Sequence, residues 1–238
     1  MTITRRTILK ALNALLLTLA APIAACRSAL AERFPTRTVE RDNFKFDPST
    51  GLIRWKKSSE KDARTEPYFL VVEGLVETPL KLSYPQLRAL AQHTQVNDFH
   101  CVEGWTIPQV KWSGFRFKEL ADLVNPSAEA KYVTFHSLGE TRFKPAGQTH
   151  YVESFDLAAL LDPHSEILLV VDMDGKPLSH DRGAPIRIIA PTQLAYKSIK
   201  FVHRVEFVKE RQLGWWSLAN PIYRWDAPVS PTRRLIEM

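Results

Sequence analysis

Residues 99–105 have the sequence Phe-His-Cys-Val-Glu-Gly-Trp, and residues 112–115 follow as Trp-Ser-Gly-Phe. Cys101 is one of two cysteines in the chain, and the other, Cys26, lies in an N-terminal segment with a separate role. The thiol of Cys101 is compatible with a buried small hydrophobic residue, with a nucleophile that uses His100 or His136 as its base, or with a metal ligand. Because a thiolate is soft and polarisable, the metal in the third case would be a transition metal.

The first 31 residues have the architecture of a signal peptide. Arg5 and Arg6 precede an apolar run over residues 11–25, which is shorter than the roughly 20 residues that span a bilayer. The paired arginines resemble a twin-arginine export signal, which predicts a periplasmic protein exported in a folded state. Residues 23–26 resemble a lipoprotein box, so lipidation of Cys26 is the alternative to cleavage after Ala31.

The formal charge of +6 does not indicate a nucleic-acid-binding protein. The leader holds Arg5, Arg6, Lys10 and Arg27 and no acid, so its removal lowers the formal charge from +6 to +2. Without a general excess of positive charge, a nucleic-acid partner loses its main support. A local basic pocket for a phosphate or another anion remains compatible with the sequence.

The composition predicts one mixed α+β domain that is rich in strands and loops. Apolar residues make up 45% of the chain, and the sixteen prolines and nine glycines favour extended segments and turns. Residues 32–66 are expected to form an irregular arm that contributes to the active site, and residues 67–238 the main domain. The patterns predict strands at 68–74, 76–82, 131–137, 167–173, 186–190 and 205–208, helices at 83–90, 117–124 and 155–161, and a short strand or loop at 98–105.

A second group of motifs lies towards the C-terminal half of the chain. Residues 174–178 are Asp-Gly-Lys-Pro-Leu, residues 183–187 are Gly-Ala-Pro-Ile-Arg, and residues 196–200 are Tyr-Lys-Ser-Ile-Lys. Together with the segment around Cys101, they resemble the sulfite oxidase family of molybdopterin-dependent oxidoreductases, over about residues 43–228. Within that family the motifs are most similar to the protein-methionine-sulfoxide reductases. The resemblance implies a sulfite oxidase-type molybdopterin-binding domain with Mo-molybdopterin as its cofactor.

The resemblance also implies roles for individual residues. Cys101 takes the place of the molybdenum ligand, and Glu103 and Asn43 the places of active-site residues near the metal. Three positions depart from the family pattern: Asp42 replaces an Asn, Ser137 replaces a Thr, and Arg182 stands where relatives have Asn or His. The implied cofactor-binding residues are Asn43, Phe44, Cys101, Ser137, Arg182, Arg187, Ser198, Ile199 and Lys200.

The chemistry of these side chains supports the same reading independently. A pyranopterin ends in a phosphate, for which Arg187, Lys200 and backbone N–H groups near Ser198 are suitable donors. His100 follows the strand pattern to the opposite face from Cys101 and is expected to pack. His136 and His150 could line a substrate cleft, and the seven histidines form no zinc signature.

The expected reaction is oxygen-atom transfer, and its direction depends on charge. A carboxylate at Glu103 would repel sulfite, so we expect reduction of a small-molecule or protein-borne sulfoxide, with protein methionine sulfoxide first, rather than oxidation of an oxyanion. A sulfite oxidase-like dehydrogenase, a cofactor-free binding module and a thiol enzyme are the alternatives. Because the chain has no Cys-x-x-Cys-His haem motif, its electrons must come from a separate partner, such as a membrane haem protein or a soluble cytochrome.

Overall fold

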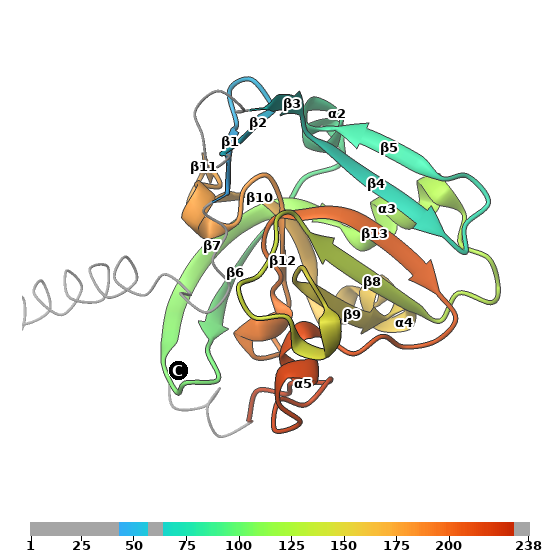
Figure 1. Cartoon of the computed structure of the whole chain (residues 1–238), viewed down its shortest axis with the longest axis vertical. Helices are drawn as coiled ribbons and strands as arrows, with labels where there is room; N and C mark the ends of the chain where they lie inside the picture. The colour runs from blue at the N-terminus through green and yellow to red at the C-terminus, as the bar shows by residue number, and fades with distance from the viewer. Residues whose placement is uncertain (1–42, 57–63, 231–238) are drawn as a thin grey trace, which may run out of the picture. The chain divides into compact units, whose positions relative to one another are not determined.

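The computed structural model describes residues 43–56 and 64–230, which belong to one compact unit, Val39–Met238 (Figure 1). The predicted leader, with its paired arginines and Cys26, lies outside the described residues, as does Asp42. No helix within the described ranges is long and apolar enough to cross a membrane.

The described part of the N-terminal arm is a small antiparallel sheet, so the prediction of an irregular arm is wrong there. Strands β1 (Phe44–Asp47), β2 (Leu52–Trp55) and β3 (Thr65–Pro67) pair in that order. Phe44, Phe46 and Ile53 are buried, while Lys45 and Arg54 between them are exposed, which is the alternation of a half-buried strand. Each strand is so short that the alternation covers only two apolar positions and is easily missed in the sequence.

The second sheet holds five strands in the order β5 (Leu80–Ser83), β4 (Phe69–Gly74), β13 (Val202–Val208), β8 (Tyr132–Ser137) and β9 (Val152–Asp156). Strand β13 pairs in parallel with β4 and antiparallel with β8. Helices α3 (Phe117–Val124) and α4 (Leu157–Leu161) lie on one face of it (Figure 1). Phe117 of α3 packs its ring against Phe135 and Phe207, so this face forms a large part of the core.

The third sheet has the order β11 (Lys176–Pro177), β10 (Leu168–Met173), β7 (Thr106–Arg116) and β6 (His93–His100), and β12 (Arg187–Ile189) also pairs with β10. Strands β7 and β10 approach closely at Gly114. A Cβ atom at this position would lie 1.9 Å from the carbonyl oxygen of Leu169. The glycine in the Trp-Ser-Gly-Phe motif is therefore required by strand packing.

Most of the predicted elements of the main domain are present. Helix α2 (Tyr84–Ala89) begins after Ser83, whose N–H donates to the Gln86 side chain, and α3, β8 and β10 are confirmed nearly to the residue. The strand predicted at 76–82 is shorter, because residues 75–79 form a connection in which Thr78 N–H donates to the Val124 carbonyl. The helix predicted at 155–161 starts later, since Phe155 belongs to β9.

Five short elements complete the described chain. Four are single turns of 3-10 helix: η2 (Pro145–Gly147), η3 (Pro163–Ser165), η4 (His180–Arg182) and η5 (Ala195–Lys197). The fifth is helix α5 (Trp215–Ala219). Turns η4 and η5 matter most for function, because each one directly precedes or contains predicted cofactor-binding residues.

Candidate functional site

Cys101 lies in a tight turn immediately after β6. The Cys101 N–H donates to the Trp105 carbonyl at 2.9 Å, and the Gly104 N–H donates to the Cys101 carbonyl at 3.1 Å. Gly104 has φ +98°, a conformation that glycine adopts without strain. Only 7% of Cys101 is exposed, so the turn holds the thiol at the buried end of the strand.

The carboxylate of Glu103 lies beside this thiol. Its Oε2 atom is 4.0 Å from Cys101 Sγ and accepts a hydrogen bond of 3.0 Å from the indole Nε1 of Trp105. The structure therefore brings together Cys101 and Glu103, which the sequence singled out. Trp105 was quoted only as part of the motif, and its role in holding the carboxylate becomes visible in three dimensions.

His100 is buried, in keeping with the packing role expected from strand alternation. Its Nδ1 atom is 2.9 Å from Oγ1 of Thr106, the residue opposite it on β7. This pair closes the base of the turn that carries Cys101.

Arg187 joins three segments through one buried guanidinium. Nη1 donates to the carbonyl of Arg182 at 3.0 Å, and Nη2 donates to the carbonyl of Ser198 at 3.2 Å. The guanidinium carbon lies 5.2 Å from the ring centre of Phe99 and 5.4 Å from that of Trp112, within cation–π range. Burial lowers the pKa of Arg187 to about 9, with a smaller contribution from the charge of Arg182.

This guanidinium also relates the two sequence motifs to each other. Phe99 lies two residues before Cys101, and Arg182 and Ser198 belong to the C-terminal motifs. Arg187 was expected to hold a phosphate. Two of its nitrogens instead donate to the carbonyls of Arg182 and Ser198. Arg187 therefore holds together the two segments that carry the other predicted residues.

In the segment at residues 198–200, two backbone N–H groups are already hydrogen-bonded within the chain, so the side chains are the groups more readily available to a cofactor. Ser198 N–H donates to the Ala195 carbonyl and Ile199 N–H to the Lys197 carbonyl, so these two amides are used within the chain. Backbone phosphate donors near Ser198 would therefore have to come from other amides of this segment, and that expectation stays a prediction. Ser198 Oγ accepts the Ala190 N–H at 3.3 Å and keeps its own hydroxyl proton for another partner.

Lys200 connects this segment to η4. Its ammonium donates to the Asp181 carbonyl at 2.7 Å, beside Arg182. A Cβ atom on Gly183 would lie 2.8 Å from Cβ of Lys200, so glycine is needed for the two segments to approach. The predicted residues Arg182 and Lys200 are thus neighbours across this contact.

The N-terminal hairpin contributes to the same region. The ring of Phe44 is fully buried, with its centre 5.1 Å from that of His180 and 5.3 Å from that of Phe201. The adjacent Asn43 has a buried side-chain oxygen with no hydrogen-bond partner among the described residues. The hairpin therefore places Phe44 against η4 and against Phe201, and Asn43 directly precedes it in the chain.

Ser137 approaches from the end of β8. It is buried, and its hydroxyl donates to the Leu138 carbonyl at 3.1 Å. Leu138 N–H in turn donates to the Phe201 carbonyl at 2.8 Å, which ties this strand end to the same segment that contacts Phe44. Phe44 and the end of β8 that carries Ser137 thus both contact Phe201, the residue that follows Lys200.

These residues suit a molybdopterin. Asn43 Oδ1 and Arg187 Nε are buried and lack hydrogen-bond partners in the described structure, and such atoms normally have one, from protein, water or ligand. The cationic side chains of Arg182 and Lys200 match a terminal phosphate. The buried thiol of Cys101 matches a soft transition metal, while the described residues contain no group of three or more His, Cys, Asp or Glu side chains arranged for a metal.

A buried ion pair beside the site was not identified from the sequence. Lys197 and Glu153 are both about 1% exposed, and Lys197 Nζ lies 2.5 Å from Glu153 Oε1 and 2.6 Å from the Ser154 carbonyl. Burial raises the pKa of Glu153, and the charge of Lys197 opposes that shift. The partners are 44 residues apart, so only the tertiary fold reveals the pair.

The buried His136 contacts the half-buried His150. His136 Nδ1 is 3.0 Å from His150 Nε2, and its Nε2 is 3.1 Å from Glu206 Oε2 and 3.0 Å from Arg204 Nη2. Burial lowers the pKa of His136 to about 3, and the charge of Arg204 contributes to the shift. The pairing of β8 with β13 encloses His136, which favours a packing role, and its place in a substrate cleft stays a prediction.

Comparison with known proteins agrees with this geometry. Residues 57–216 match the family model of the oxidoreductase molybdopterin binding domain. The protein-methionine-sulfoxide reductase catalytic subunit of Campylobacter jejuni is 32% identical over 182 residues, which is 73% of this chain and 60% of that protein. The crystal structure of the sulfane dehydrogenase SoxCD from Paracoccus pantotrophus superposes with a TM-score of 0.52 at 16% identity, over 74% of this chain and 46% of that chain, and supports the fold. The chain therefore spans about half to three fifths of the length of these relatives.

Proposed function

This chain belongs to the family of oxidoreductase molybdopterin binding domains, and from that premise we propose that it reduces a sulfoxide by oxygen-atom transfer. Its cofactor is Mo-molybdopterin, which supplies two-electron oxygen-atom transfer chemistry when bound. The leading substrate is methionine sulfoxide in proteins. The similarity to the protein-methionine-sulfoxide reductase catalytic subunit of Campylobacter jejuni supports this choice.

The residues of this chain would share the work of binding and orientation. Cys101 would hold the metal through its thiolate, and the Cys101–Trp105 turn would fix the direction of that bond. Arg182 and Lys200 would neutralise the phosphate, and the hydroxyl of Ser198 would donate to a polar atom of the pterin. Ser137 Oγ, whose proton goes to the Leu138 carbonyl, would accept a hydrogen bond from the pterin. Asn43, with its unpartnered oxygen, would accept a hydrogen bond near the metal. Binding, orientation and charge are the contributions that a protein makes to such a cofactor.

The observation that carries the choice of substrate is the position of Glu103, with its carboxylate 4.0 Å from Cys101 Sγ. Like charges repel, and the repulsion is stronger beside a protein than in bulk water. A sulfite dianion at the metal would meet this repulsion, whereas a neutral sulfoxide would not. The hydrogen bond from Trp105 keeps the carboxylate from turning away.

Three further features belong to the same proposal. The leader with Arg5 and Arg6 would export the folded chain to the periplasm by the twin-arginine route, with lipidation at Cys26 as the alternative. A separate redox protein, such as a membrane haem protein or a soluble cytochrome, would supply the electrons. The domain would extend over residues 67–238, and the hairpin from residues 43–56 would complete the active site.

The test uses protein exported from its own cell. Molybdenum is measured by elemental analysis, and methionine sulfoxide reduction with benzyl viologen is compared with sulfite oxidation with ferricyanide. We expect the native protein to contain molybdenum and to reduce the sulfoxide, and we expect Cys101→Ser to contain none. Glu103→Gln is the matched variant: it should keep its metal, lose sulfoxide reduction in part, and accept sulfite better than the native protein.

Each alternative predicts a different result. Rapid sulfite oxidation without sulfoxide turnover would identify a sulfite oxidase-like dehydrogenase. Metal-free protein whose activity survives molybdate starvation and is abolished by alkylation of Cys101 would identify a thiol enzyme. Metal-free protein for which Cys101→Ser is silent would identify a binding module.

A further inference from the structure

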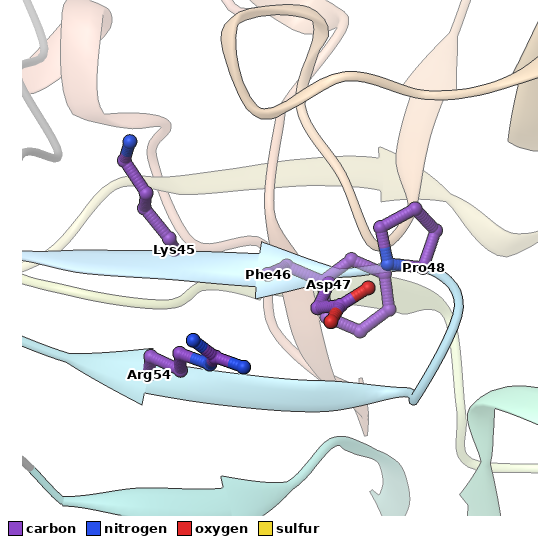
Figure 2. Close-up of a pocket in the computed structure, with 5 residues that line it drawn as sticks. All are labelled: Lys45, Phe46, Asp47, Pro48 and Arg54. Atoms are coloured by element: carbon purple, nitrogen blue, oxygen red, sulfur yellow. The ribbon is translucent and has the colours of Figure 1, made fainter.

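An open hollow of about 270 Å³ lies along the β1–β2 hairpin (Figure 2). Lys45, Phe46, Asp47, Pro48 and Arg54 line it. Sites for small molecules are usually enclosed, mostly apolar and about 300–1,000 Å³ in volume. This hollow is smaller, open and edged by charge, so it suits contact with a macromolecule better than capture of a small ligand.

Three cations share this face, and we call them the hairpin patch: Lys45, Arg54 and Lys56. Lys45 and Arg54 are directly opposite each other in the strand register, and Figure 2 shows both side chains on the same side of the hairpin. Lys56 lies just beyond the end of β2, and its N–H donates to the Asn43 carbonyl at 2.7 Å, so the pairing of the hairpin continues to Lys56 and alternation places it on the face of Arg54. All three are exposed.

Among the described residues, no acidic side chain forms an ion pair with a cation of the hairpin patch. None of the ion pairs found there includes Lys45, Arg54 or Lys56. Asp47 is nearest in sequence, but its carboxylate accepts the Ser49 N–H at 2.9 Å and the Ser49 hydroxyl at 2.6 Å. Like charges directly opposite on neighbouring strands repel and destabilise the pairing. An acidic partner would reduce the repulsion between Lys45 and Arg54.

The patch lies directly behind residues of the proposed active site. Lys45 and Phe44 are consecutive, so their side chains point to opposite faces of the hairpin. Phe44 packs on His180 and Phe201 on the inner face, and Asn43 opens the same strand. A protein seated on the outer face is separated from these residues by one sheet layer, about 10 Å at the usual packing distance.

We propose that the hairpin patch is the docking surface for an acidic face of the redox protein that delivers electrons to this chain. The inference rests on the proposed function, because only a reductase needs that donor. Reduction of one sulfoxide to a thioether breaks the S–O bond, consumes two electrons and two protons, and releases one water. The docked redox protein supplies the electrons and is oxidised, and the solvent supplies the protons.

Charge and size favour a redox protein over the other kinds of partner. Transient electron-transfer complexes bury small areas, below about 1,200 Å², and depend on complementary charge for rapid association. Recognition of an anionic lipid surface usually needs about four to eight clustered cations, more than the patch provides. Protein-borne sulfoxides are neutral and occur on varied surfaces, so one fixed cationic patch suits a single recurring partner better.

The test compares two double variants with the same change in net charge. Lys45→Glu/Arg54→Glu reverses the patch, and Lys118→Glu/Lys209→Glu reverses two lysines elsewhere whose side chains are 64% and 63% exposed. Reduced flavodoxin, an acidic electron-transfer protein, is the probe. Its oxidation by the molybdenum-loaded enzyme is followed by stopped flow at low and high salt, and its binding is measured separately by fluorescence titration without turnover.

We expect the patch variant to lower the low-salt rate at least about tenfold and to weaken flavodoxin binding, because charge steering changes association rates by about 10 to 1,000-fold. The control variant should retain the native rate within about threefold, and the native rate should fall with salt. Both variants should reduce methionine sulfoxide normally with benzyl viologen. If that reaction fails in the native protein, the proposed function fails, while the titration still tests the patch.

Equal losses in both double variants, or no loss in the patch variant, would overturn the proposal. So would a patch variant that no longer sediments with phosphatidylglycerol vesicles but retains the native flavodoxin rate. That result would assign the patch to a lipid surface.

Discussion

Replacement of Lys197 by methionine tests the buried ion pair that supports the cofactor-binding turn. Methionine keeps most of the volume of the lysine stem but leaves Glu153 without its cation. Removing one partner of a buried pair costs about 3–5 kcal/mol, a large share of the roughly 5–15 kcal/mol that stabilises a typical domain. Because Ser198 follows Lys197 directly, a loosened turn should also lower the molybdenum content of the purified protein.

The loss of stability should depend on pH in a defined direction. Burial raises the pKa of Glu153, and the charge of Lys197 holds that rise in check. Without Lys197, the folded variant keeps a proton on Glu153 at pH values where the unfolded chain, with an ordinary pKa near 4.5, has released it. The unfolded state then binds fewer protons, so the free energy of unfolding of the variant falls as pH rises above 4.5, by at most about 1.4 kcal/mol per unit.

The assay is urea denaturation of the native protein and of Lys197→Met at pH 5 and pH 8, followed by circular dichroism. The gap between the two proteins should be wider at pH 8. Lys131→Met, at an exposed lysine, is the control and should change stability by less than about 0.5 kcal/mol. A loss below about 1 kcal/mol that is equal at both pH values would refute the reasoning, because it would mean that the Glu153 carboxylate is solvated. Glu153→Gln combined with Lys197→Met should recover part of the loss.

Three other predictions concern single positions. His136 has a folded pKa of about 3, so the unfolded state alone gains a proton below pH 6.5, and stability should fall by about 2 kcal/mol from pH 7.5 to pH 5. His136→Gln should flatten this slope in thermal melts, and an unchanged slope would show that other groups cause it. Gly114→Ala should cost about 3 kcal/mol, because the new methyl group meets the Leu169 carbonyl, while Ser113→Ala should be mild in the same denaturation assay. Arg187→Met should lose most of its molybdenum and melt at a lower temperature, since it frees two carbonyls; native metal content would contradict this role.

Local patterns were sufficient for much of the main domain. Residues 117–124 repeat apolar side chains at helical spacing, and residues 167–171 form a continuous apolar run, so both elements follow from local patterns alone. The chemistry at Cys101 is also local: the thiol and the carboxylate are two residues apart in a turn that Gly104 permits, which is why a motif predicted their proximity.

Long-range contacts had to be decided by the tertiary structure. The hairpin at residues 44–55 is too short to show periodicity, and its burial depends on packing against His180 and Phe201 far along the chain. Strand pairing encloses His136, and the fold brings Lys197 to Glu153. The sequence by itself determined which side chains are available for the cofactor and the metal. Only the tertiary structure decided that Arg187 ties their segments together and that three cations face outwards behind them, because both depend on contacts between residues distant in the chain.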